Sequence, residues 1–576
     1  MDAGQLLLQR GLITDDQLQQ VREQDAEGIA AVEAAANLGF VNEAAALEVL
    51  AAETGLEFLD LRDAKIDLNL LQEFPVKLIH RELLFPISRE NGAMVVATSD
   101  PFNLYPIDEA GAATGLSIIP VLAARREIDL LVKRHLGVGS ETIDNLIEQR
   151  SDDEVIELLG DIDVDGSELS EMAQEASVIR LVNEILLEAI ELRASDVHIE
   201  SQSGGLVIRY RIDGMLHAQP VPPEISQFQA AIISRLKIMA RLNIAEKRLP
   251  QDGRIKLKVK GREVDVRVSV IPMIHGESMV MRLLDKSSMV FDLQGLGMEA
   301  DTYGVFSDLI RIPHGIVLVC GPTGSGKTTT LYSSLLEIRS PENKIITTED
   351  PVEYQLDGIN QIQVHARIGL TFGHTLRSIL RHDPDIVLVG EIRDLETAEN
   401  AIQASLTGHL VFSTLHTNDA AGAYTRMIDM GVEPFLVAST VEAVMAQRLI
   451  RRLCLDCRRE VDPKSLDLPP DFPFEQLADR PLYEPVGCRE CRQVGYRGRM
   501  GIYELMVTTD DIRQLAHDRA STWQLKTAAL ENGMATLRDD GWRKVAAGHT
   551  SVDEVLRITK GDRMLHMERD REAKKS

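Results

Sequence analysis

The sequence predicts an α/β protein of several domains, with a parallel-sheet core that binds phosphate. The apolar run 316–320 leads into a glycine-rich turn at 321–328, and a helix-compatible run follows at 329–338. Three further strand-like runs lie downstream, and each is followed by polar residues. At 576 residues the chain is too long for one hydrophobic core, so several domains are expected.

The turn at 321–328 reads Gly-Pro-Thr-Gly-Ser-Gly-Lys-Thr, a complete phosphate-binding loop. Its glycines let backbone N–H groups approach a phosphate that a Cβ would hold away. Lys327 is expected to neutralise the β- and γ-phosphates of ATP, and the Thr328 hydroxyl to ligate Mg²⁺. The alternative, a turn that binds nothing, fits poorly because the strand before the turn, the turn itself and the helix after it all match the pattern of a phosphate-binding loop. The expected nucleotide contacts are Gly321, Pro322, Thr323, Gly324, Ser325, Gly326, Lys327, Thr328 and Thr329.

Two acids follow strand-like runs. Glu391 ends the run 385–391, and Glu349 follows the run 344–348. Ligands of an open α/β sheet bind at the carboxyl ends of its strands, which is where both acids are expected. Hydrolysis needs a carboxylate that orients or deprotonates water, so both are candidate bases. The residues alone do not choose between them, and each also fits a solvated acid at the end of a buried strand.

Two histidines bracket the strand-like run 410–414. His409 precedes the run and His416 follows it. Singly, each is more often a packed or surface residue than a catalytic one. Their place in a phosphate-binding sheet nevertheless favours sensing of the γ-phosphate.

Arginines are the remaining ingredient of hydrolysis, because a cation from a neighbouring domain or subunit often stabilises the departing phosphate. Taken one at a time, each is more often a surface or salt-bridge residue. The candidates are Arg254, Arg267 and Arg282 in the region 172–290, and Arg377, Arg381 and Arg393 beside the phosphate-binding core. A second cluster is expected to form a solvated face near the cysteine pairs: Arg448, Arg451, Arg452, Arg458 and Arg459.

Four of the five cysteines form two CxxC pairs, Cys454/Cys457 and Cys488/Cys491, separated by the 30 residues 458–487. Two such pairs are the ligand set of a closed structural Zn²⁺ site. Free thiols and a redox pair are the alternatives. The metal is expected to hold together the proline-rich insert 462–485, which has few large apolar residues of its own.

Composition limits the partners. The net charge of −28 disfavours a general nucleic-acid surface. No apolar run approaches the ~20 residues that span a bilayer, and the N-terminus lacks a secretory signal. We therefore expect a cytoplasmic protein that reaches a membrane only through partners.

The chain divides by composition and periodicity. The region 137–171 is acidic and is expected to be a linker with one short helix. Helical spacing resumes at Ser177, and strand patterns at 196–200, 206–212, 255–259 and 263–269 indicate an α+β domain. The expected divisions are a small mixed first N-terminal domain or two very small ones at 1–136, the linker at 137–171, a second N-terminal domain at 172–290, the phosphate-binding domain with C-terminal helices at 291–560 including a zinc module at about 454–491, and a charged tail at 561–576.

These motifs resemble the ATPases of type II secretion and type IV pilus assembly, often called secretion-superfamily E proteins. The resemblance is nearly continuous from about 172 to 560. It rests on the phosphate loop at 321–328, an acidic box at 348–353, a Walker B motif at 389–391, a histidine box at 407–416, the CxxC pairs, and the segments 495–504, 533–537 and 548–556.

The resemblance implies a RecA-like ATPase core with an inserted four-cysteine zinc module, preceded by a PAS-like second N-terminal domain. It implies a homo-hexamer in which hydrolysis of ATP with Mg²⁺ drives an inner-membrane platform protein, so that pilin-like subunits leave the membrane. The four cysteines favour the assembly or secretion branch, because the retraction motors of this family lack them.

Residues 1–136 resemble the first N-terminal domain of the family, which binds cyclic di-GMP in some members through a repeat beginning Arg-Leu-Gly. The first repeat here reads Asp2-Ala3-Gly4, and the second lacks Arg-Leu-Gly before Leu38. Binding of cyclic di-GMP is therefore expected to be weak or absent, and docking to a cytoplasmic-facing partner is the expected role.

Two other functions are open. A hexameric nucleic-acid translocase would need a basic, aromatic-studded channel, whereas the chain has two Trp and 13 Phe in 576 residues. A scaffold that binds nucleotide without hydrolysis would not need both Glu349 and Glu391. A motor ATPase is the expectation that the residues favour.

Overall fold

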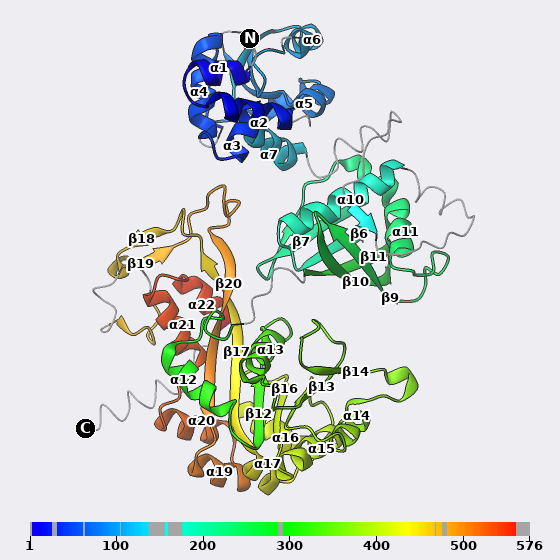
Figure 1. The fold of residues 1–576 in the computed structure, drawn as a ribbon, viewed down its shortest axis with the longest axis vertical. Helices are drawn as coiled ribbons and strands as arrows, with labels where there is room; N and C mark the ends of the chain where they lie inside the picture. The colour runs from blue at the N-terminus through cyan, green and yellow to red at the C-terminus, as the bar shows by residue number, and fades with distance from the viewer. Residues whose placement is uncertain are drawn as a thin grey trace. The chain divides into compact units, whose positions relative to one another are not determined.

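The computed structural model describes most of the chain (Figure 1). It divides into two compact units, Met1–Ser287 and Ser288–Ser576. No helix among its described residues is long and apolar enough to cross a membrane. The described residues are 3–25, 31–61, 64–90, 92–103, 105–136, 156–158, 176–285, 292–466, 468–474 and 481–559.

The first N-terminal region contains two small hydrophobic cores. One packs four short helices around Leu7, Val21 and Leu50, and the other packs helices on a four-stranded sheet in the order β1-β4-β3-β2. The sequence allowed one mixed domain or two very small ones; Leu122 of β4 packs in the helical core, so the two cores adjoin and the choice stays a prediction. Its helices are α1 (Ala3–Gln9), α2 (Asp15–Asp25), α3 (Ala31–Asn37), α4 (Glu43–Thr54), η1 (Leu68–Gln72), α5 (Val76–Glu82), α6 (Tyr105–Thr114) and α7 (Arg125–Leu136), and its strands are β1 (Glu57–Phe58), β2 (Phe85–Glu90), β3 (Ala93–Thr98) and β4 (Ser117–Leu122).

The second N-terminal domain is an antiparallel sheet of seven strands, in the order β5-β9-β10-β11-β6-β7-β8. Alternation along strands such as β7 and β9 buries one face against the two helices, whose apolar residues complete the core. All four strand patterns expected between 196 and 269 form strands. The elements are α10 (Ala176–Glu191), η2 (Pro223–Phe228), α11 (Gln229–Met239), β5 (Ile156–Leu158), β6 (Asp196–Gln202), β7 (Gly205–Ile212), β8 (Met215–Ala218), β9 (Gln251–Val259), β10 (Arg262–Met273) and β11 (Gly276–Asp285).

Strand β5 corrects part of the linker prediction. Ile156–Leu158 pairs antiparallel with Leu257–Val259 of β9 and becomes the edge strand of the sheet. Without β5, strand β9 would be the edge of the sheet and would offer unpaired N–H and C=O groups to an extended segment. The composition of the acidic region does not reveal that one of its segments pairs there. The rest of 137–171, apart from 156–158, and the tail at 561–576 lie outside the described residues.

The second unit is built on a seven-stranded sheet in the order β14-β13-β15-β16-β12-β17-β20. All neighbouring pairs are parallel except β17 with β20. Strand β12 is buried along its whole length, as expected for a central parallel strand. The strands of this sheet are β12 (Gly315–Cys320), β13 (Ile345–Glu349), β14 (Asn360–Gln363), β15 (Ile386–Val389), β16 (Leu410–Leu415), β17 (Val441–Leu453) and β20 (Tyr496–Val507). Two further strands, β18 (Arg459–Val461) and β19 (Leu482–Glu484), form a separate antiparallel pair.

The helices of this unit complete two cores, one on each side of strand β12. The α/β prediction for this region is therefore confirmed. The helices are α12 (Ala300–Leu309), α13 (Lys327–Ile338), η3 (Ala366–Ile368), α14 (Phe372–Ile379), α15 (Leu395–Leu406), α16 (Ala421–Asp429), α17 (Pro434–Thr440), η4 (Pro463–Ser465), α19 (Asp510–His517), α20 (Thr522–Glu531), α21 (Leu537–Ala546) and α22 (Val552–Ile558).

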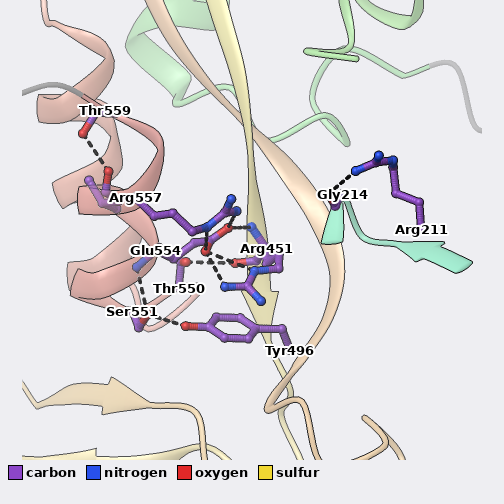
Figure 2. A network of polar contacts seen from close by, with 10 residues as sticks. Arg211, Gly214, Arg451, Tyr496, Thr550, Ser551, Glu554, Arg557 and Thr559 are labelled. Carbon is purple, nitrogen blue, oxygen red and sulfur yellow. Dashed lines mark hydrogen bonds and ion pairs between the residues drawn. The ribbon is translucent and has the colours of Figure 1, made fainter. Parts of the chain in front are cut away.

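A buried ion network fastens helix α22 to strand β17 of the seven-stranded sheet (Figure 2). Glu554 of α22, whose side chain is fully buried, pairs with Arg451 of β17 and with Arg557. The Arg451 guanidinium also lies 4.0 Å from the centre of the Tyr496 ring. The expected solvated arginine face was therefore wrong for Arg451, which is 14% exposed, but fits Arg459, which is 70% exposed.

Candidate active site and metal centre

The phosphate loop connects β12 to α13, and space is tight at two of its glycines, Gly321 and Gly326. A Cβ at Gly321 would lie 2.6 Å from the carbonyl oxygen of Gln447 and 2.6 Å from Ser325 Oγ. Gly326 has a φ of +92°, and a Cβ there would lie 2.7 Å from Gln447 Nε2. The loop therefore follows a path that only glycine permits, with its backbone next to β17.

Lys327 begins helix α13 and curls back over the loop. Its Nζ donates to the carbonyl oxygens of Gly321 (2.8 Å) and Pro322 (3.0 Å). Burial lowers the pKa of Lys327 below its usual value. A helix N-terminus and an ammonium group thus converge on one loop, which is the arrangement that binds an anion such as phosphate.

Strand β17 supplies two residues that sequence reasoning did not connect with the loop. Gln447 accepts a 2.8 Å hydrogen bond from Thr330 Oγ1 of α13. Arg448 donates to the carbonyl oxygens of Gln447 (2.9 Å) and Asn418 (2.8 Å). The expectation of a solvated Arg448 near the cysteines was wrong, because β17 pairs in parallel with β12 and brings Arg448 to the loop. No local pattern predicts that pairing.

Glu391 lies just beyond the carboxyl end of β15, and its side chain is 13% exposed. His416, just beyond β16, places Nε2 3.2 Å from Glu391 Oε2, and Arg393 places Nη2 2.7 Å from Oε1. Neighbouring parallel strands end at the same edge, which explains why Glu391 and His416 meet.

Glu349 ends β13 and is 4% exposed. Its carboxylate accepts hydrogen bonds from Tyr332 Oη of α13, from Thr347 Oγ1 at 2.5 Å and from Gln361 Nε2 at 3.1 Å. The two expected acids therefore stand in different surroundings: an arginine and a histidine face Glu391, whereas neutral donors hold Glu349.

His409 lies away from these groups. It precedes β16, so it stands at the amino edge of the sheet, beside Gly315 at the start of β12. Its Nδ1 lies 2.8 Å from the carbonyl oxygen of Ala404 and 3.1 Å from Thr407 Oγ1. A six-residue strand spans about 20 Å, so the histidines at its two ends cannot share one phosphate. The structure places His416, and not His409, beside Glu391.

The three candidate arginines of the second N-terminal domain stand in one row across its sheet. Arg254 pairs in register with Arg267, Arg267 with Arg282, and Arg282 with Asp196. These residues line a pocket of about 440 Å³. Asp196 holds Arg282 through a 3.1 Å contact to Nε. Three guanidinium groups and two carboxylates, Asp196 and Asp252, line the pocket, and this excess of positive charge suits an anion.

Two of the other candidate arginines lie on and next to α14. Arg377 pairs with Glu396 at 2.9 Å, and Arg381 donates to the carbonyl oxygen of Arg377 at 2.8 Å. The ion pair of Arg377 connects α14 with α15, and the hydrogen bond of Arg381 satisfies a carbonyl group at the C-terminal end of α14.

The four paired cysteines come together in the insert between β17 and β20. Cys454 Sγ lies 3.8 Å from Cys488 Sγ, Cys457 Sγ lies 3.6 Å from Cys491 Sγ, and all four sulfurs lie within 4.8 Å of one another. Four thiolates at ~2.3 Å around a tetrahedral Zn²⁺ would be separated by roughly 3.8 Å. The donor set and spacing therefore fit zinc.

Backbone N–H groups prepare one of these sulfurs. Cys488 N and Gly495 N each approach Cys491 Sγ at 3.1 Å. Burial raises the pKa of Cys491, but these N–H groups outweigh burial and leave the pKa below its usual value. The loop thus favours the thiolate form, which is the form that binds a metal.

Comparison with known proteins gives the family. Residues 171–557 match the family model described as type II/IV secretion system protein. The chain belongs to this family. Residues 54–142 of this secretion-family protein match the model of the MshEN domain. The resemblance seen in the motifs is confirmed.

Two relatives of this secretion-family protein match it over nearly its whole length. It is 42% identical over 565 residues to the type IV pilus assembly ATPase PilB of Myxococcus xanthus, covering 97% of this chain and 99% of that protein. It is 44% identical over 563 residues to the type II secretion system protein E of Xanthomonas campestris pv. campestris, covering 96% and 97%. A crystal structure of the pilus retraction motor PilT with bound ADP is similar at 26% identity with a TM-score of 0.44, covering 67% of this chain and 98% of that one.

Proposed function

We propose that this protein is a motor ATPase of a type II secretion or type IV pilus machine, in which hydrolysis of ATP drives assembly of a pseudopilus or pilus. The observation that carries the proposal is the carboxyl edge of one parallel sheet. The phosphate loop, Glu349, Glu391 and His416 all lie there, in a chain that is 42% identical over nearly its full length to a relative named as an ATPase. Ligands of such sheets bind at this edge.

The phosphate loop, Gly321 to Thr329, binds ATP through the backbone N–H groups of its residues other than Pro322, and Lys327 neutralises the transferring phosphate. The exposed Thr328 hydroxyl and a carboxylate form an oxygen donor set that suits Mg²⁺. Such an ion, when bound, offsets negative charge on the phosphates. Glu391 and Glu349 would share two tasks, which are to supply oxygen ligands to that ion and to orient the attacking water. His416, through its contact with Glu391, senses the γ-phosphate. We assign His409 a structural role at the turn before β16.

Arg254 and Arg267 supply the remaining cations of the proposed mechanism. Their pairing in register and the pocket that they line support a role in contacting phosphate. Because they belong to the second N-terminal domain, hydrolysis would depend on how that domain meets a nucleotide in the assembled ring. The PAS-like description of this domain is part of the proposal, supported by its antiparallel sheet and its two long helices.

The role that we propose for zinc is structural. Cys454, Cys457, Cys488 and Cys491 would hold it, leaving no ligand position for a substrate water. The insert has a small apolar core in which Phe472 and Leu482 pack against Trp542, so the metal adds to packing that is already present. The presence of the four cysteines also supports the assembly or secretion branch over retraction.

The proposed working form is a homo-hexamer at the inner face of the inner membrane, in contact with a platform protein and a docking protein. The family and its named relatives support this placement. Weak or absent binding of cyclic di-GMP stays a prediction, because the arginine of the binding repeat is missing. Titration of the full chain with cyclic di-GMP measures it, and saturation at micromolar concentration would contradict it.

Replacement of Lys327 by alanine tests the site. Lys327→Ala should lower phosphate release from ATP roughly 100-fold or more, since it removes a charge that stabilises the transferring phosphate. The control is Lys464→Ala, an exposed lysine on the insert. Undiminished phosphate release by folded Lys327→Ala would refute the assignment, and stimulation of wild-type hydrolysis by single-stranded DNA would favour a nucleic-acid translocase.

A further inference from the structure

Three side chains from three segments converge on the buried carboxylate of Glu349. Tyr332 reaches it from the helix that follows the phosphate loop, Thr347 from the same strand, and Gln361 from the neighbouring strand β14. Thr347 and Glu349 are two positions apart on β13, so their side chains share one face of the sheet. Thr347 also pairs in register with Gln361, which brings the amide to that face.

These contacts leave little freedom to the carboxylate. Two oxygens offer about four acceptor positions, and three of them are taken, two on Oε1 and one on Oε2. One position on Oε2 is left for a ligand. Because Glu349 is only 4% exposed, water cannot replace a lost hydrogen-bond donor to this carboxylate at low cost.

The amide of Gln361 is itself held in one orientation. Its Oε1 accepts from Leu356 N at 2.7 Å, and its Nε2 donates to the carbonyl oxygen of Tyr354 at 2.9 Å as well as to Glu349. A flipped amide would face a carbonyl and a carboxylate with its oxygen. The network therefore directs an N–H group, and not an oxygen, at Glu349.

Tyr332 is similarly placed by its surroundings. Its ring packs edge-on against Tyr354 with centroids 6.5 Å apart, and the residue is 1% exposed. It lies five positions after Lys327 on α13. One hydrogen bond thus connects the helix that carries the phosphate-binding lysine to the strand that carries the acid.

We propose that Tyr332 and Gln361 are positioning residues for hydrolysis, which set the orientation of Glu349 relative to the phosphate loop. The inference rests on the proposed role of Glu349 in orienting the attacking water. Neither residue touches substrate in this scheme. Both act through the carboxylate, so their loss slows turnover and leaves ATP binding intact.

The experiment uses full-length Tyr332→Phe and Gln361→Glu. Tyr332→Phe keeps the ring packing and removes one donor to a charged acceptor, so kcat should fall roughly 10- to 100-fold with KM for ATP nearly unchanged. Gln361→Glu keeps the acceptor for Leu356 N but turns a donor into a like charge beside Glu349, so its loss of kcat should be at least as large. The matched control is Tyr424→Phe, which removes a buried hydroxyl bonded to Thr508 at 2.6 Å and should leave kcat unchanged.

A double-variant cycle separates positioning from general stability. If Tyr332 acts through Glu349, adding Tyr332→Phe to Glu349→Gln should lower kcat no further. Wild-type kcat in both Tyr332→Phe and Gln361→Glu, with Glu349→Gln impaired, would overturn this inference alone. Wild-type kcat in Glu349→Gln would overturn the proposed role of Glu349 as well. Additive losses, or losses matched by Tyr424→Phe, would assign Tyr332 to stability and overturn its positioning role.

Discussion

Replacement of Glu554 by glutamine should destabilise the ATPase unit more than any ordinary surface change. The fully buried carboxylate accepts five hydrogen bonds: three from Arg451, at 2.9, 3.0 and 2.7 Å, and two from Arg557, at 2.8 and 2.6 Å. Removal of one partner from a buried ion pair typically costs about 3 to 5 kcal/mol. Arg557 is 39% exposed and can regain water, so the lower end, about 3 kcal/mol, is expected (Figure 2).

The sign of the pH dependence follows from the pKa of Glu554. Burial alone raises this pKa, but the hydrogen bonds from Arg557 and Arg451 outweigh burial and leave it below the ordinary value of 4.5. A lowered carboxyl pKa stabilises the fold above the unfolded value and stops doing so as pH falls through the folded value. The cost of Glu554→Gln should therefore be the same at pH 6 and pH 8.

Scanning calorimetry of the full chain measures this cost. The transition of the ATPase unit is identified by its upward shift with added ADP, since a ligand raises the stability of the unit that binds it. A loss of about 3 kcal/mol should lower that transition by roughly 6 °C or more. The control is Glu484→Gln, whose partner Arg459 is 70% exposed, with an expected cost below ~0.5 kcal/mol. A shift no larger than the control's would refute the reasoning.

Three other outcomes are expected. Burial raises the pKa of Asp540 to about 6 from 3.8, so the native state binds this proton more tightly than the unfolded chain, and stability falls as pH rises. Between pH 5 and pH 7, the stability of Asp540→Asn should therefore rise by about 1 kcal/mol relative to wild type, and parallel pH profiles of the two proteins in calorimetry would contradict this. Burial raises the pKa of Cys320 to about 12, so iodoacetamide at pH 8 should leave it unmodified in the native protein but not in denaturant, as peptide mass spectrometry would detect. Elemental analysis should find one zinc per chain, lost in Cys488→Ser but retained in Cys320→Ala, and zinc-free wild-type protein with full stability would refute the metal site.

The strands and the loop of the ATPase unit were predictable because their signals are local. An apolar run followed by a glycine-rich turn specifies a buried strand and a tight loop within about 15 residues, and β12, the loop and α13 follow in that order. The paired cysteines were equally readable, since CxxC spacing brings two sulfurs to one turn. By contrast, the edge strand β5 depends on an unpaired edge formed a hundred residues later.

Local pattern also could not sort the candidate residues. His409 and His416 lie at the two ends of one six-residue strand, and only the parallel sheet shows that the second stands beside Glu391. Arg448 and Arg451 are three positions apart in a basic run. One lies at the phosphate loop and the other in a buried network with Glu554. Strand pairing thus places Arg448 and Arg451, which lie on the same strand, in different surroundings.

The sequence by itself determined the phosphate loop, the acids and histidines at the ends of the strands, the four-cysteine ligand set and the family, because each is carried by residues close together in the chain. Only the tertiary structure decided which groups meet across it: Tyr332 with Glu349, 17 positions apart, and Thr330 with Gln447, 117 positions apart. The physical reason is that such contacts follow from the order in which strands pair and from what each helix covers, and neither leaves a periodic signal in sequence.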